Sequence, residues 1–319
     1  MDKNLIKAMT WEYPDALPVS VSTLPAMWLQ LGDEMTRFAA QYPDFLPQGR
    51  TPESVATSIS GRYRAGAWTD EWGCVWTNRH EGMDAYVTVH PVPRREDIRT
   101  LKIPPNRDGS LPHGFMYLRL LDLRGFEEAM MDFAEECEEL QILIDKVLAY
   151  NCIQIECALP HTGQVMGFGD DLGMQKGLAI GAQKWRKYLK PCFARMYGKV
   201  KRAGRLVYMH TDGCIWEIMP DLQECGVDMI NPQFRANGLE NLVRVCRREG
   251  KIPVNLDLDR QMFPFATPSQ LRDHARQCVE ALWLPEGGLG ISVELNYDIP
   301  LQSAAALLDE LRALRGYRG

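Results

Sequence analysis

Polar side chains that can act in acid–base or metal chemistry follow the expected strands in the second half of the sequence. Asp170 and Asp171 end the segment FGDD, and His210 and Asp212 stand two positions apart in HTDG. Later strand ends add Asn231 and Gln233, then Asp257, Arg260 and Gln261, and last Glu294 and Asn296. Any one of these residues could serve only as a helix cap. Because the C-terminal ends of parallel strands meet at one edge of a sheet, the whole set predicts a shared polar pocket.

A metal ion could be bound by His210, Asp212 and Glu294. One imidazole and two carboxylates can hold zinc and leave a coordination position open for a substrate. The alternative is a metal-free site in which His210 and the carboxylates exchange protons with the substrate. The residue types and their spacing are compatible with both kinds of site.

The paired carboxylates Asp170 and Asp171 cannot both face the pocket. On an extended segment, adjacent side chains point to opposite sides, so one carboxylate faces the pocket and we expect the other to cap the next helix. The surrounding GFGDDLG has neither the Lys–Ser/Thr of a P-loop nor the spacing of a dinucleotide-binding fingerprint. This sequence therefore argues against a phosphate-binding loop.

Strands and helices alternate regularly over residues 121–319. The apolar spacing predicts strands at 152–156, 205–210, 227–231, 251–256 and 289–295. It predicts helices at 126–147, 183–201, 215–224, 239–248, 268–283 and 301–314. Such alternation predicts a parallel sheet, either a (β/α)8 barrel or a doubly wound sheet.

Residues 1–120 are irregular and rich in proline and tryptophan. Short strands are expected at 19–23 and 86–90. Trp68, Trp72 and Trp76 recur every four residues, which favours packing on one helical face over a lid above a pocket.

The composition excludes several classes of protein. Of 319 residues, 45% are hydrophobic and 24% charged, which is typical of a folded domain. The net charge is −6 and no basic block is present, so we expect no binding to nucleic acid or to anionic membranes. The sequence has no uninterrupted apolar stretch of about 18 residues, so we expect no transmembrane helix. The nine cysteines form no CxxC pair and the N-terminus has no apolar run, so we expect reduced thiols and a cytoplasmic location.

Several segments resemble the uroporphyrinogen decarboxylase superfamily. They include WTDEWG at 68–73, FGDDLGMQKG at 168–177, the segment from HTDG to NPQ at 210–233, and NLDLDRQ at 255–261. The resemblance extends over nearly the whole chain. It implies one (β/α)8 barrel over residues 1–319, in which residues 1–120 supply the first barrel elements and an irregular region over the mouth. It also implies a homodimer.

The resemblance implies one of two activities. One branch of the family decarboxylates uroporphyrinogen without a cofactor, and its catalytic aspartate corresponds to Asp70. Segment 17–28 lacks the arginines of that branch. The other branch comprises zinc-dependent methyltransferases that use a corrinoid carried by a partner protein. His210 matches their zinc-binding histidine, whereas Asp212 and Glu294 stand at or near the positions of their cysteines.

We therefore expect a corrinoid-linked methyltransferase that acts on a small or macrocyclic substrate. The alternatives are a cofactor-free decarboxylase of uroporphyrinogen or of a smaller carboxylic acid, and a non-catalytic small-molecule binder. A decarboxylase would need basic groups, for which Arg119, Arg235 and Arg260 are candidates. The expected catalytic residues are Asp70, Asp170 and His210, and the expected substrate-binding residues are Trp72, Asp171, Asn231, Gln233, Asp257, Arg260, Gln261 and Asn296.

Overall fold

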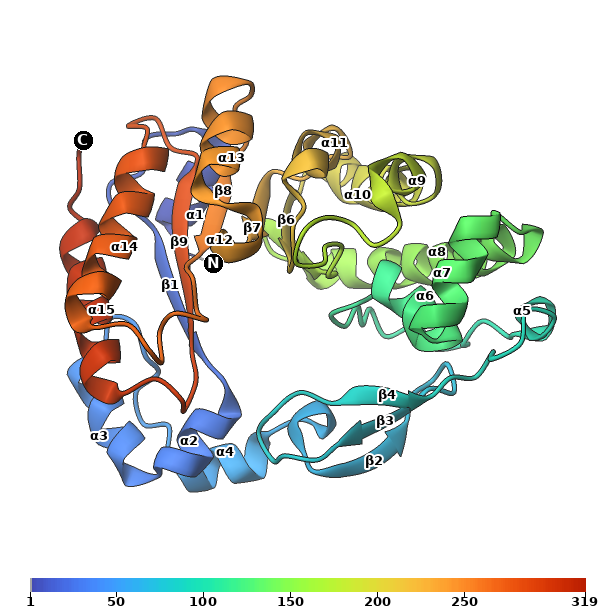
Figure 1. Ribbon diagram of the computed structural model, residues 1–319, viewed down its shortest axis with the longest axis horizontal. Helices are drawn as coiled ribbons and strands as arrows, with labels where there is room; N and C mark the ends of the chain where they lie inside the picture. Colours follow the sequence, from blue (N-terminus) through green and yellow to red (C-terminus); the bar gives the residue numbers. More distant parts are fainter. Residues whose placement is uncertain (1) are drawn as a thin grey trace. The chain divides into compact units, whose positions relative to one another are not determined.

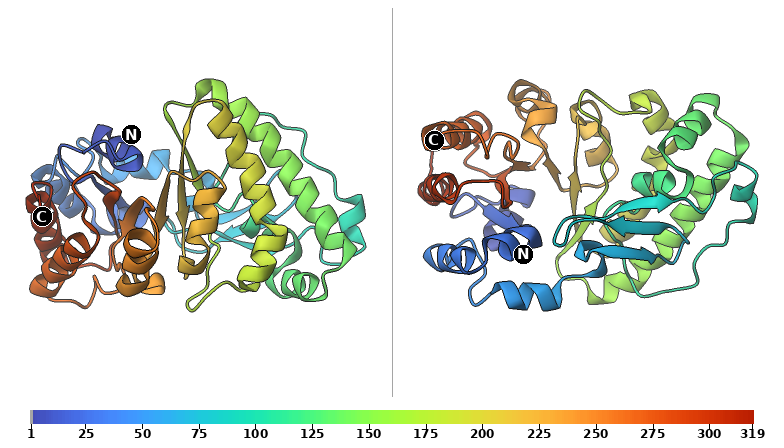
Figure 2. Two further views of the ribbon diagram at one scale, coloured as in Figure 1. Left: turned by 90° about the horizontal axis from the view of Figure 1, so that it is seen from above. Right: turned by 60° about the horizontal axis from the view of Figure 1, so that its bottom comes forward.

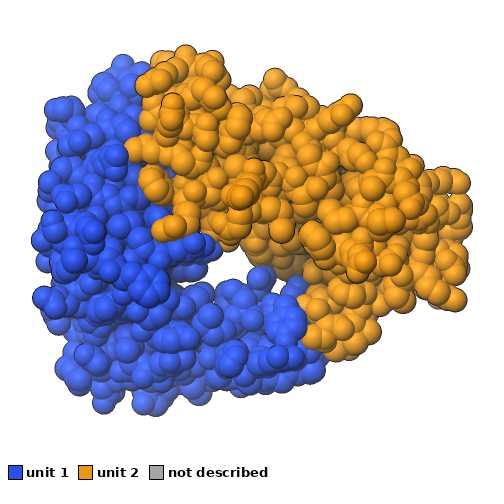
Figure 3. Space-filling view, viewed as in Figure 1, with its two compact units in different colours: residues 1–68, 76–86, 253–319 blue, residues 69–75, 87–252 orange. Residues whose placement is uncertain are grey.

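The computed structural model describes residues 2–319, which divide into two compact units (Figure 3). Unit 1 comprises the chain up to residue 68, residues 76–86 and residues 253–319, and unit 2 comprises residues 69–75 and 87–252. Parallel strands follow the order β1-β9-β8 in unit 1 and β7-β6-β5 in unit 2 (Figure 1). The expected α/β, barrel-like fold is confirmed, although the described residues form six such strands and not eight.

Unit 2 contains the strands β5 (Val165–Gly169), β6 (Leu206–Thr211) and β7 (Met229–Pro232). Residues in β6 alternate between buried and half-buried, whereas all four residues of β7 are buried, as expected for a covered parallel sheet. The helices of this unit are α5 (Asp97–Thr100), α6 (Tyr117–Arg124), α7 (Phe126–Glu135), α8 (Glu138–Ala158), α9 (Gly181–Tyr188), α10 (Lys190–Arg202), α11 (Met219–Glu224), α12 (Phe234–Asn237) and α13 (Leu239–Val243), with 3-10 turns at Leu159–His161 and Trp216–Ile218 and a π-helical turn at Arg244–Arg248.

An aromatic core fixes β5 and β6 against their helices. Helix α10 packs on β6 and on α8, as Figure 2 shows. The Phe168 ring of β5 lies 4.9 Å from that of Tyr197 in α10 and 5.4 Å from that of Phe115. Tyr197 and Phe193 are fully buried. This packing holds the C-terminal ends of β5 and β6 in place.

Unit 1 contains β1 (Val19–Thr23), β8 (Val254–Asp257) and β9 (Leu289–Leu295). Strand β9 lies between the other two, and helices α14 and α15 pack against each other. The helices of this unit are α1 (Lys3–Thr10), α2 (Pro25–Leu31), α3 (Asp33–Gln41), α4 (Pro52–Ser58), α14 (Pro268–Leu282) and α15 (Leu301–Leu314), with a 3-10 turn at Gly61–Tyr63.

A separate three-stranded sheet is formed by β2 (Gly66–Thr69), β3 (Val75–Asn78) and β4 (Tyr86–Val89). The prediction that the three tryptophans share one helical face is wrong, because Trp68 and Trp76 lie on the neighbouring strands β2 and β3. Their rings stack 6.2 Å apart with an interplanar angle of 10°. Trp72 lies in the turn between these strands, where it is 4% exposed and meets the Tyr150 ring edge-on at 5.1 Å. Trp72 therefore packs as a core residue.

Two expected elements of unit 2 are corrected by the structure. The helix expected at 126–147 breaks at Glu136, whose φ of 54° is left-handed, and α8 then continues to Ala158. The strand expected at 152–156 is therefore part of α8. Its apolar and β-branched residues are buried on several sides of a long helix, so their pattern resembles that of a strand.

Among residues 2–319, no helix combines the length and the apolar character that crossing a membrane requires.

Candidate active site

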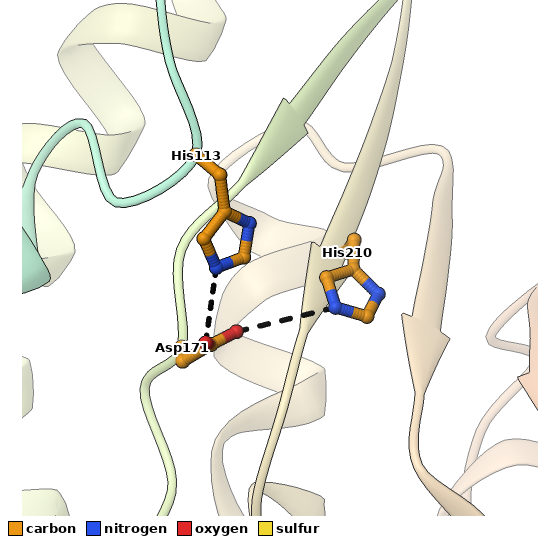
Figure 4. Close-up of side chains that lie close together, drawn as sticks. All are labelled: His113, Asp171 and His210. Carbon is orange, nitrogen blue, oxygen red and sulfur yellow. Dashed lines mark hydrogen bonds and ion pairs between the residues drawn. The ribbon is translucent and has the colours of Figure 1, made fainter. Parts of the chain in front are cut away.

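Three polar side chains converge at the C-terminal ends of β5 and β6 (Figure 4). His113 Nε2 lies 3.0 Å from Asp171 Oδ2, and His210 Nε2 lies 4.0 Å from Asp171 Oδ1. The two imidazole rings are 5.7 Å apart. One donor atom from each residue lies within 4.8 Å of the others, and all three residues are half-buried. The group thus offers two ring nitrogens and a carboxylate to one small volume.

The strand register places His210 in this group. His210 is opposite Gly169 of β5 and Asn231 of β7. Its Nδ1 lies 2.8 Å from Asn231 Oδ1, so Nδ1 carries a hydrogen and donates it to the amide oxygen. Its Nε2 lies 3.2 Å from Asp212 Oδ1. Asn231 therefore fixes the ring so that Nε2 faces the two carboxylates of Asp171 and Asp212.

The adjacent aspartates have opposite roles, as expected from their alternation. Asp171 faces the site, and its Oδ1 accepts a hydrogen bond from the Asp212 amide at 2.9 Å. Asp170 is fully buried and accepts hydrogen bonds from the amides of Tyr117 at 2.6 Å and Leu118 at 3.0 Å. Asp170 therefore caps α6, which precedes it in the chain. The expectation that it caps the helix that follows it is wrong. Helix α6 has no side-chain cap of its own, so Asp170, the residue after β5, supplies one.

His113 is the site residue that sequence reasoning missed. It lies in an irregular loop, four residues before α6, and no strand pattern points to it. Asp170 anchors the start of α6, and the Gly114 amide donates to Gly169 O at 2.8 Å. These two attachments bring His113 beside Asp171. The one signal available in the sequence was a helix start at residue 117 that lacks its own capping side chain.

The glycines of GFGDDLG allow close approach of other segments. A Cβ atom on Gly169 would lie 2.5 Å from His113 Nδ1. A Cβ atom on Gly213 would lie 2.1 Å from the carbonyl of Gly173, where the two strand-end loops cross. The Gly213 amide donates to Gln233 Oε1 at 3.0 Å. These glycines therefore serve the packing of the site, and a phosphate loop is not needed to explain them.

The site is electrostatically polarised. Burial alone would lower the pKa of His210, but the hydrogen bond and charge of Asp212 outweigh burial and raise this pKa to about 9. Burial alone would raise the pKa of Asp171, but the hydrogen bond and charge of His113 lower it. Burial raises the pKa of Asp170 to about 7, against the backbone amides that favour its charged form. Without a metal, His210 is therefore a cation at neutral pH and faces ionised Asp171.

The donor atoms of the three residues fit a zinc ion. Zinc–nitrogen and zinc–oxygen bonds of about 2.1 Å in a tetrahedron place neighbouring ligand atoms about 3.4 Å apart. In the metal-free protein one donor atom from each residue lies within 4.8 Å of the others, so the side chains would draw closer together around the ion. Three protein ligands would leave one position open, as in catalytic zinc sites. This group of donors differs from the expected set of His210, Asp212 and Glu294.

Asp70 and Arg119 form a buried ion pair in unit 2. Arg119 Nη1 donates to Asp70 Oδ2 at 2.6 Å, and both side chains are at most 10% exposed. Asp70 Oδ1 accepts from the amides of Trp72 and Cys74. Burial raises the pKa of the neighbouring Cys74 thiol to about 12. The carboxylate of Asp70 thus closes the turn at 70–74 and attaches it to α6.

The remaining expected site residues belong to unit 1. Arg260 Nη1 donates to Glu294 Oε1 at 2.9 Å, and Asp257 is buried in β8. Arg260, Gln261, Glu294 and Asn296 line a pocket of about 410 Å³. The expected residues therefore form one group at the strand ends of each unit, while Asp70 and Trp72 lie apart in the turn at 70–74.

Comparison with known proteins identifies relatives by family and by fold. The family model described as uroporphyrinogen decarboxylase (URO-D) matches residues 115–314. A search of curated proteins finds no match. The fold is similar to that of a methyltransferase from Methanosarcina mazei, with 14% identity, a TM-score of 0.66 and 97% of each chain covered.

Two other structures are less similar. A B12-independent methionine synthase from Shewanella sp. W3-18-1 has 12% identity and a TM-score of 0.47 over 94% of this chain and 97% of that one. A dihydropteroate synthase from Xanthomonas albilineans has 16% identity and a TM-score of 0.34, over 50% of this chain and 61% of that one.

Proposed function

Because the chain belongs to the uroporphyrinogen decarboxylase family, we propose that this enzyme is a methyltransferase whose reaction takes place at the His113–Asp171–His210 group. The methyl group would pass between a corrinoid, carried by a partner protein, and an acceptor bound at this group. The observation that carries the proposal is the convergence of two imidazoles and one carboxylate within 4.8 Å. The methyltransferase from Methanosarcina mazei, which has a similar fold, adds support.

The three side chains would hold a zinc ion. Bound zinc would act as a Lewis acid that lowers the pKa of the methyl acceptor. Asn231 keeps Nε2 of His210 directed toward the site, and the Asp212 amide holds Asp171 in place. Imidazole and carboxylate ligands are harder than thiolates, so the site favours zinc over softer metals such as Cu(I).

Decarboxylation of uroporphyrinogen has less support. Asp70, which corresponds by resemblance to the catalytic aspartate of that branch, is paired with Arg119 and with two backbone amides. The site at His210 also presents the carboxylates of Asp171 and Asp212. Such charges would repel a substrate that carries several carboxylates.

Elemental analysis of the purified protein and a methyl-transfer assay test this function together. We expect about one zinc per chain in the wild type and none in His210→Ala or His113→Ala. Free methylcobalamin can replace the partner-bound corrinoid, and its demethylation can be followed by absorbance with a set of thiol, alcohol and amine acceptors. Both variants should lose that activity.

The matched control is His161→Ala, which removes an exposed histidine of the same unit. It should keep both zinc and activity. A wild-type protein without zinc, or full activity in His113→Ala, would contradict the proposal.

A further inference from the structure

A pocket of about 410 Å³ opens in unit 1 at the C-terminal ends of its three strands. Leu24 follows β1, Arg260 lies three residues beyond β8, and Glu294 is the last residue but one of β9. The volume is within the range of small-molecule sites. The proposed function does not use these residues.

One side of the pocket carries an ion pair that a ligand can reach. The side chains of Arg260 and Glu294 are 33% and 31% exposed, and their contact is 2.9 Å long. An ion pair as exposed as this contributes little to folding stability. Asp298 adds a second carboxylate to the lining. The polar side therefore offers one guanidinium and two carboxylates.

The other side of the pocket is apolar. Phe263 and Ile299 are 2% and 3% exposed, whereas Phe265 is 87% exposed. The turn that presents Phe265 is fixed at its base, where the Asp259 amide donates to His274 Nε2 at 3.1 Å. The Phe265 amide donates to Met262 O at 3.0 Å. A phenylalanine held in water by a hydrogen-bonded turn has apolar surface that a ligand can cover.

The charges on the lining select among ligand classes. A ligand with only a carboxylate would bind Arg260 but would meet the negative charges of Glu294 and Asp298. A ligand with only a cation would pair with Glu294 and Asp298 but would bring no carboxylate for Arg260. A zwitterion satisfies both, because its carboxylate contacts the guanidinium and its ammonium contacts the carboxylates.

We propose that this pocket binds an amino acid zwitterion with an apolar side chain. The carboxylate of the ligand contacts Arg260, its ammonium group contacts Glu294 and Asp298, and its side chain packs against Phe265. A free and a trimethylated ammonium carry the same charge, but only the free ammonium can donate hydrogen bonds to these carboxylates. The inference goes beyond the proposed function and does not rest on it, since binding requires neither metal nor methyl donor.

Isothermal titration calorimetry of the full chain with four probes tests this assignment. L-leucine carries both charges, 4-methylpentanoate lacks the ammonium, 3-methylbutylamine lacks the carboxylate, and N,N,N-trimethyl-leucine carries a methylated ammonium. We expect at least one of the two zwitterions to bind at least about tenfold more tightly than both singly charged analogues. The relative affinities of the two zwitterions then show whether the pocket prefers a free or a trimethylated ammonium group.

Variants locate the binding. Arg260→Gln and Glu294→Gln should each weaken binding of the zwitterion at least about tenfold. Arg260→Lys keeps the charge and should weaken it less, which separates recognition from a folding defect. Phe265→Ala should weaken leucine binding and leave glycine binding unchanged.

The control is Arg276→Gln, which removes an ion pair with Glu310 elsewhere in unit 1 and should leave binding unchanged. The proposal is overturned if neither zwitterion binds. It is also overturned if a singly charged analogue binds as well as the zwitterions, or if Arg260→Gln and Arg276→Gln bind alike.

Discussion

Two polar groups lie at strand ends of this chain, and they differ in how their charges are held. In unit 2, His210 is fixed by Asn231, and Asp171 by a backbone amide. In unit 1, Arg260 lies on a turn beyond β8, and one of its partners is the equally accessible Glu294. Fixed donors suit a site that must keep its geometry during a reaction. A half-exposed ion pair suits a site where a ligand takes over the contacts of each partner.

The strongest way to break the unit 2 site is to fill the space under His113. Gly169→Ala places a Cβ atom 2.5 Å from His113 Nδ1, so the ring must move. We expect zinc affinity to fall at least about 100-fold, as measured by competition with a chelator. Gly167→Ala in the same strand meets nothing within 4 Å and should bind zinc normally. Equal zinc affinities of the two variants would contradict the assignment of His113 as a ligand.

The second prediction concerns the attachment of α6. Asp170→Ala leaves the buried amides of Tyr117 and Leu118 without their acceptor. Its free energy of unfolding should fall by about 2–4 kcal/mol, because both amides lose a partner that water cannot replace. Asp2→Ala removes an exposed cap from α1 and should cost only about 0.5–1 kcal/mol. Urea denaturation measures both, and a cost for Asp170→Ala no larger than that for Asp2→Ala would refute the role of Asp170.

The third prediction concerns pH. His210 must lose a proton to bind a metal, and its pKa in the metal-free protein is raised to about 9. Zinc affinity should therefore increase by up to about tenfold per pH unit toward pH 9 and level off above it. Competition titrations at several pH values measure this slope, and an affinity independent of pH between 7 and 9 would exclude His210.

Stability of the metal-free protein should change with pH in the opposite direction. Because the folded pKa of His210 exceeds its unfolded value, the histidine stabilises the fold fully below about pH 6.5. This contribution is lost as the pH rises through about 9. Urea denaturation of the chelator-treated protein should show the loss, and His210→Ala should reduce it.

The smallest effect sharpens the contrast between the two groups. Arg260→Gln should change the free energy of unfolding by less than about 0.5 kcal/mol, because both side chains of its ion pair with Glu294 are about one-third exposed to water. Its binding of the zwitterion should nevertheless fall. Urea denaturation measures the free energy of unfolding, and calorimetry measures the affinity for the zwitterion. A large loss of stability would show that the ion pair serves to stabilise the fold.

Sequence reasoning anticipated the strand-end residues better than the residues between elements. His210 and Asn231 lie one residue before the ends of β6 and β7, whereas Asp171 and Asp212 follow β5 and β6. The structure joins all four by direct contacts. The positions of His210, Asp212 and Asn231 follow from strand periodicity and from the common edge of a parallel sheet. Strand β5, which precedes Asp171, is not among the predicted strands. The roles of these residues in catalysis and binding remain predictions.

His113 could not be found in this way, because its place depends on contacts across the chain. It is 58 residues from Asp171 and reaches it through the cap that Asp170 forms on α6. The misplaced strand at 152–156 has a related cause. Helix α8 is buried on several sides, so its apolar residues lose the one-sided spacing that identifies a surface helix.

The close approach of Gly169 to His113 also has an evolutionary consequence. A sequence that carries any side chain at position 169 has no room for an imidazole in the observed place at position 113. The two positions must therefore change together, or the glycine must arise first and the histidine follow. Related chains should thus show a glycine at 169 wherever they have a histidine at 113, while other residues at 113 leave position 169 free to vary.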